Sequence, residues 1–172
     1  MARFTQYPAA SVTDYTDATT FLIANEDGEI KQASLDGLLT NYGCDIRCAS
    51  LTIASADVLQ LNSTPLTIVA AQGAGTAIDV LSASMKMTYN SVAYATNTTL
   101  ELKINGGSSS QMQFASQILS SASDVFNKVI GNTTTSTNMV ENADLQVSVL
   151  TGDPTAGDSD ITVYVLYRVI AV

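Results

Sequence analysis

The chain has 172 residues, a net charge of −9 and a pI near 4.1, and it contains no histidine and no tryptophan. Without histidine, a Ser-His-Asp triad and the usual zinc sites are excluded, and the acidic balance argues against binding a nucleic-acid backbone. The chain has no run of about 18 apolar residues, the length needed to span a membrane, and its first residues show no secretory signal. We therefore expect a protein that is not an enzyme, has no cofactor and is assembled in a cytoplasm.

The first predicted unit is a small arm over residues 1–49. Two strands are expected, over 20–25 and 29–33, because an Asp-Gly pair ending at Gly28 suits a tight hairpin turn between two apolar runs. A short helix is expected to begin at Ser34, since serine is a common N-cap and an acid follows in the first turn. Two strands and one short helix bury too little to be stable alone, so this arm is expected to pack against something else.

The second predicted unit, residues 50–172, is an antiparallel β-sandwich of jelly-roll type, giving an all-β protein. The prediction rests on short alternating segments separated by polar turns, in a number close to eight. Strands are expected at 52–53, 66–71, 76–89, 99–105, 111–118, 145–149 and 160–172. A single helical turn capped by Ser55 is expected to follow the first strand. Residues 120–132 fit either a short helix that ends at Gly131 or a further strand.

Alternation within these strands predicts which side chains face the core. Leu100, Leu102 and Ile104 are expected to point inward, and Glu101 and Lys103 outward.

The last strand is apolar on both faces. Ile161 to Val169 supply one face at every second position, and Leu166 and Ile170 supply the other. A strand of this kind is either central in its sheet or meets another chain with its outer face.

Two groups of residues could be read as chemical sites, and both have a simpler explanation. The segment 152–160 has three aspartates, but its spacing matches no EF-hand, and Asp, Pro and Gly are also what a hairpin loop requires. Cys44 and Cys48 are spaced C-x-x-x-C, which is not the redox spacing. We expect buried free thiols, with a disulfide as the alternative, and no metal site.

The N-terminal stretch from Tyr7 to Leu39 resembles a small module found at the start of tailed-bacteriophage structural proteins. The shared pattern is an opening "P-A-A" and spaced aspartates, a strand, an Asp-Gly turn, a basic short strand and a helix-like "S-L-x-x-L". The matching residues are Pro8, Ala9, Ala10, Asp14, Asp17, Asp27, Gly28, Lys31, Leu35 and Leu38. Tyr7 departs from the pattern, which more often has leucine there.

The remainder of the chain is similar to β-sandwich domains of phage virion proteins, over most of residues 51–170. This resemblance implies a virion protein: a homotrimeric capsid decoration (cement) protein that binds the major capsid protein or another virion protein. The alternative is a head- or tail-fibre adaptor that takes part in attachment to the host surface. Neither reading involves nucleic acid or a membrane. The candidate contact residues are Pro8, Phe21, Ile23, Leu35, Leu38, Tyr89, Tyr94, Leu166 and Ile170.

Overall fold

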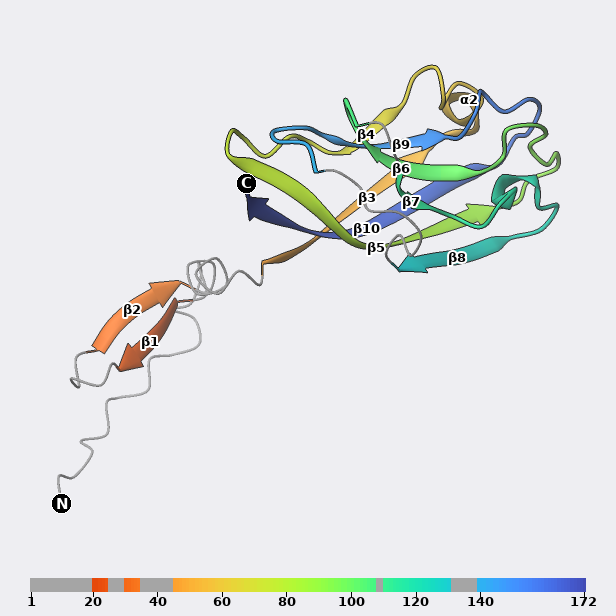
Figure 1. Ribbon diagram of the computed structural model, residues 1–172. Coiled ribbons are helices and arrows are strands. Elements are labelled where there is room, and N and C mark those ends of the chain that lie inside the picture. The colour runs from red at the N-terminus through yellow and green to blue at the C-terminus, as the bar shows by residue number, and fades with distance from the viewer. Residues whose placement is uncertain (1–19, 25–29, 35–44, 108–109, 131–138) are drawn as a thin grey trace, which may run out of the picture. The chain divides into compact units, whose positions relative to one another are not determined.

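The computed structural model describes the backbone of residues 20–24 and 30–34, and the whole of residues 45–107, 110–130 and 139–172 (Figure 1). The chain divides into two compact units, 1–45 and 46–172. Strand β3 of the second unit begins at Ile46, so the boundary lies a few residues before the expected position at 49/50. Nothing in the N-terminal sequence marks this point strongly, because β3 begins with exposed residues.

The described part of the first unit is an antiparallel hairpin. Strands β1 (Thr20–Ala24) and β2 (Ile30–Ser34) pair from Thr20 opposite Ser34 to Ala24 opposite Ile30. The hairpin agrees with the expectation, but Ser34 is the last residue of β2 and not the first of a helix. The expected turn, the helix and the contact residues Pro8, Leu35 and Leu38 lie outside the described residues.

The second unit is an eight-stranded antiparallel sandwich, which confirms the all-β prediction. Its strands are β3 (Ile46–Ile53), β4 (Leu66–Val69), β5 (Thr76–Thr88), β6 (Leu100–Ile104), β7 (Ser110–Gln113), β8 (Val125–Ile130), β9 (Leu145–Val149) and β10 (Asp160–Ala171). One sheet has the order β3-β10-β5-β8 and the other β4-β9-β6-β7. If the strands are counted from one to eight, these orders are 1-8-3-6 and 2-7-4-5, the arrangement of a jelly roll. Figure 1 shows the sheets as two layers.

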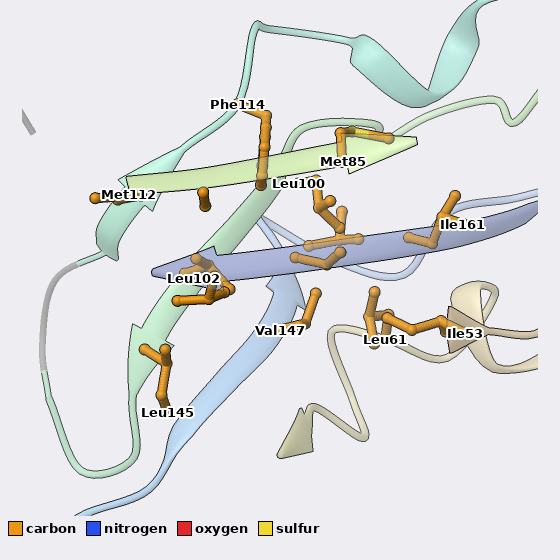
Figure 2. Close-up of a cluster of buried hydrophobic side chains, with 14 of the residues drawn as sticks. Ile53, Leu61, Met85, Leu100, Leu102, Met112, Phe114, Leu145, Val147 and Ile161 are labelled. Carbon is orange, nitrogen blue, oxygen red and sulfur yellow. The ribbon is translucent and has the colours of Figure 1, made fainter. Parts of the chain in front are cut away.

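The core lies between the two sheets, as Figure 2 shows. Leu100, Leu102 and Ile104 of β6 are at most 1 % exposed, as their alternation predicts. From β9 and β10 the same pattern places Leu145, Val147, Val149, Ile161, Val163 and Val165 in the interior. The expected inward faces are therefore confirmed. Strand β10 lies between β3 and β5 and is therefore central in its sheet. This position accounts for its apolar inward side and for part of the apolar character of its outward side.

Strand β3 is longer than the two residues expected, because it pairs with β10 from Ile46 opposite Arg168 to Ile53 opposite Ile161. It is an edge strand, and its residues up to Ser50 are exposed or half-buried. Cys48 lies on it with an exposed free thiol, which corrects the expectation of a buried one. Cys44 lies outside the described residues.

The short helix α2 (Ser55–Val58) begins where a helical turn is expected, but its capping differs. The N-cap residue is Ala54, whose side chain cannot accept a hydrogen bond. The Ser55 backbone N–H donates instead to Asp160 Oδ1 at 2.9 Å, so a carboxylate at the start of β10 satisfies this helix end. The prediction that Ser55 is the cap is therefore wrong.

The segment with two open alternatives forms a strand, β8, which pairs with β5 at the edge of its sheet. Only a single 3-10 turn, η2 (Ile118–Ser120), precedes it. Glu101 is also placed differently from the expectation. It is only 6 % exposed, and its carboxylate accepts a hydrogen bond from the Ser110 hydroxyl on the neighbouring strand β7.

Candidate interaction surface on the sandwich

The three aspartates of segment 152–160 each support the fold at a different place. Asp153 accepts the backbone N–H groups of Asn62 and Ser63 at 2.8 and 2.9 Å, and Asp160 accepts that of Ser55. The carboxylates of Asp153 and Asp160 therefore accept hydrogen bonds from backbone N–H groups in different segments. They do not point toward a common centre, as the ligands of a calcium ion would. Among the described residues, no cluster of three His, Cys, Asp or Glu side chains could hold a metal ion.

Asp158 ties the β9–β10 loop to the loop after β5. Its carboxylate accepts the N–H groups of Ser91 and Val92 at 3.1 and 2.8 Å, the Ser91 hydroxyl at 2.5 Å and the Asn90 amide at 2.9 Å. The Ser91 hydroxyl, followed by these backbone donors, lowers the pKa of Asp158 from 3.8 to about 2, because the donors favour the charged form. This carboxylate is a clasp between loops.

The clasp predicts how stability depends on pH. A depressed folded-state pKa means that the contribution of Asp158 is present above pH 4 and is lost as the pH falls from about 4 to about 2. Asp158→Asn should therefore flatten the fall in the free energy of unfolding over this window, measured by urea denaturation at successive pH values. Asp57→Asn is the matched control, since this exposed carboxylate accepts no hydrogen bond from the described residues. Equal profiles for wild type and Asp158→Asn would contradict the assignment.

Two tyrosines named as contact candidates have local roles. Tyr94 is 2 % exposed, and its hydroxyl donates to the Ser159 carbonyl at 2.5 Å. Burial, aided by the charges of Asp160 and Asp158, raises the pKa of Tyr94 to about 12. Its ring therefore belongs to the core and not to an exposed contact surface. Tyr89 is half-buried, with its hydroxyl donating to the Ser91 carbonyl at 2.6 Å.

The main unpartnered surface of the described residues is the outward side of the β3-β10-β5-β8 sheet, which we call the outer face. Large apolar side chains stand exposed on it: Phe126 is 76 % exposed, Ile130 66 %, Tyr164 44 % and Leu166 40 %. A groove of about 410 Å³ crosses this face between strands β3 and β8. Several large exposed apolar side chains on one face are typical of an interaction site.

The groove exists because large and small side chains alternate across the sheet. Strand β5 contributes Ser82 and Ser84, which are flanked by Tyr164 and Leu166 on β10. On the other side of β5 lies β8, where Lys128 is the direct partner of Ser84. The serines form the floor of the groove, and the larger side chains on either side form its walls.

The charges of the outer face differ from those of the protein as a whole. Three of the seven Lys and Arg residues of this acidic chain lie here: Lys86, Lys128 and Arg168. Arg168 Nε donates to Asp79 Oδ2 at 2.7 Å, whereas the two lysines make no hydrogen bond or ion pair with the described residues. The outer face thus combines apolar side chains with unpaired positive charge.

A second hollow, of about 400 Å³, lies among the loops at one end of the sandwich and is lined mainly by hydroxyl and amide groups. Four of its lining residues have a left-handed backbone: Thr96, Asn97, Gln117 and Thr151, with φ between 45° and 74°. Some of its polar side chains bond one another, for example Thr151 Oγ1 donates to Asn97 Oδ1 at 2.9 Å.

Of the predicted contact residues, Leu166 lies in the wall of the groove, and Ile170 lies half-buried further along β10. Phe21 and Ile23 are on β1, opposite Ala33 and Lys31 of β2. Phe126 and Tyr164, which are exposed on the outer face, are not among the predicted contact residues. Residues 125–130 alternate between the two sides of the sheet, so Phe126 could have been predicted to face outward if this segment had been assigned to a strand.

Comparisons with known proteins add no identity: the chain matches no protein-family model, no curated protein and no solved structure. Among the described helices, none combines the length and the apolar character needed to cross a membrane.

Proposed function

We propose that this chain is a structural protein of a tailed-phage particle that decorates the assembled head. Its partners would be further copies of itself and the major capsid protein. The observation that carries the proposal is the exposed apolar outer face of the sandwich, with Phe126 and Ile130 standing in solvent. The jelly roll supports it by analogy, because this fold recurs in viral capsid proteins, although a fold alone does not define a function.

The mechanism is the addition of buried interface to the shell. A protein that binds only the assembled state stabilises that state by mass action, by a free energy that grows with the logarithm of its free concentration divided by its Kd. The first unit, residues 1–45, would act as the attachment device. Its hairpin of β1 and β2 has only two strands, and an isolated two-stranded hairpin is marginally stable in water. Contact with a neighbouring virion protein would supply the missing burial.

Purified particles test this proposal. We expect the protein to be present in many copies, comparable in number with the capsid subunits. Particles that lack it should release their DNA at a lower temperature than complete particles, measured by dye access during heating, and adding the purified protein back should restore the difference. Absence of the protein from particles, or equal heat resistance with and without it, would contradict the proposal.

A fibre or adaptor that contacts a host-surface sugar is the second candidate. It is favoured by the hydroxyl- and amide-lined hollow around Asn97 and Thr151, since such groups can bond sugar hydroxyls. This reading expects few copies per particle and loss of host adsorption when the protein is deleted. Normal adsorption by particles without the protein would rule it out.

A further inference from the structure

Two neighbouring rows at the centre of the outer face share one size pattern, in which small and large side chains alternate from strand to strand. In one row, Ser50 of β3, Tyr164 of β10, Ser84 of β5 and Lys128 of β8 stand side by side, as their pairing register shows. In the next row, the corresponding residues are Cys48, Leu166, Ser82 and Ile130. In both rows β3 and β5 carry the small side chains, and β10 and β8 carry the large ones.

A row of small, large, small and large side chains is complementary to a second copy whose strand order is reversed by a two-fold rotation, because each large side chain then meets a small one. If a two-fold axis runs parallel to the strands between β10 and β5, then β10 of one copy lies over β5 of the other, and β8 lies over β3. Tyr164 then meets the partner's Ser84, and Leu166 meets the partner's Ser82. An axis perpendicular to the strands would instead set each strand on its own copy, with large side chains against large ones.

The charges of the face suit the same arrangement. Arg168 lies in the row of Asp79, so the parallel axis sets Arg168 over the partner's Asp79, joining two ion pairs into one cluster. Lys128 comes to lie over the partner's Ser50. No cation of one copy is placed over a cation of the other, so the positive charge of the face does not oppose this pairing.

The size of the face is sufficient for a weak but specific pair. Four strands of about eight residues, at about 4.8 Å spacing and 3.3 Å rise, present roughly 500 Å² per copy, or about 1,000 Å² for two. That is the lower limit for specific interfaces. Aligned sheets keep their mean strand directions within about 30° of each other, and each sheet is twisted. The central residues Tyr164, Leu166, Ser82 and Ser84 therefore stay in register, and the corners diverge.

We infer that the outer face binds the same face of a second copy about a two-fold axis parallel to its strands. The large side chains of β10 then fill the groove over the serines of β5. This contact uses the face on which the phage proposal also rests, but it needs only the protein itself, so the two can be tested separately. It also differs from the three-fold association that the sequence resemblance implies.

The test exchanges large and small side chains and measures the mass of the full chain by sedimentation equilibrium over a range of concentrations. Wild type should show a monomer–dimer equilibrium. Ser84→Tyr should weaken it by about tenfold or more, because two rings would then compete for one space. The exchange double variant, Ser84→Tyr with Tyr164→Ser, should restore dimerisation, since the ring on β5 of each copy then lies over a serine on β10 of the other.

Ala56→Tyr is the matched control, because it adds the same ring at an exposed position of α2 and should leave the dimer unchanged. Circular dichroism and thermal unfolding of each variant separate loss of pairing from loss of fold. A monomer at all concentrations, a trimer, or a double variant as weak as Ser84→Tyr would overturn the inference. If the protein is a monomer, the virion proposal still holds, since the outer face could then bind the capsid. If the protein is absent from particles, the virion proposal fails, and the inference of a two-fold dimer is unaffected.

Discussion

Replacing Leu102 by alanine is expected to lower the free energy of unfolding of the sandwich by about 2–5 kcal/mol. Leu102 is 0 % exposed at the middle of β6, where it faces the opposite sheet among the core side chains in Figure 2. Truncation removes three buried carbon atoms and leaves a cavity, because the strands on either side are held by their ladders and cannot close in. A loss of this size is a large part of the stability of an ordinary domain.

The measurement is urea denaturation in dilute solution, followed by circular dichroism. Leu166→Ala is the matched control: it removes the same atoms from a strand position that is 40 % exposed, and should cost about 1 kcal/mol or less. Comparable losses for the two variants would contradict the assignment of Leu102 to the core and Leu166 to the surface.

Gly157→Ala is expected to destabilise the protein by about 2–5 kcal/mol, from backbone strain and overpacking together. Gly157 has φ +95°, a conformation that alanine adopts only with strain, and an added methyl group would overlap the ring of Tyr94. That ring cannot move aside easily, because it is buried and its hydroxyl is bonded to the Ser159 carbonyl.

Gly73→Ala separates the two causes. Gly73 has a similar φ of +107°, but a methyl group there would meet nothing within 4 Å, so only the strain of about 1–3 kcal/mol applies. In a Tyr94→Leu background, the additional cost of Gly157→Ala should fall toward that of Gly73→Ala, because the shared contact makes the two substitutions non-additive. Equal costs at the two glycines in the wild-type background would show that the Tyr94 contact is unimportant.

The sequence by itself determined the fold class and most of the inward faces. Alternation is a local property: when Leu100, Leu102 and Ile104 recur at every second position, they share a face whichever strand lies beside them. Long strands with this pattern, such as β5 and β10, were predicted almost to the residue. The absence of histidine likewise needs no structure to exclude a triad or a conventional zinc site.

The tertiary structure decided what depends on neighbours that are distant in the chain. The start of β3 is set by its pairing with β10, more than a hundred residues away, because its own exposed residues carry little hydrophobic signal. The capping of α2 by Asp160 and the burial of Glu101 beside Ser110 could not be predicted either, because each depends on a residue from another element.

The outer face was decided in the same way. Its rows join side chains from β3, β10, β5 and β8, which only the strand order brings together. Local alternation tells which residues of one strand share a side, but not which strand lies next to it, and hence not where large and small side chains meet. The groove over Ser82 and Ser84 is therefore a property of the jelly-roll topology, and no single segment of the sequence contains it.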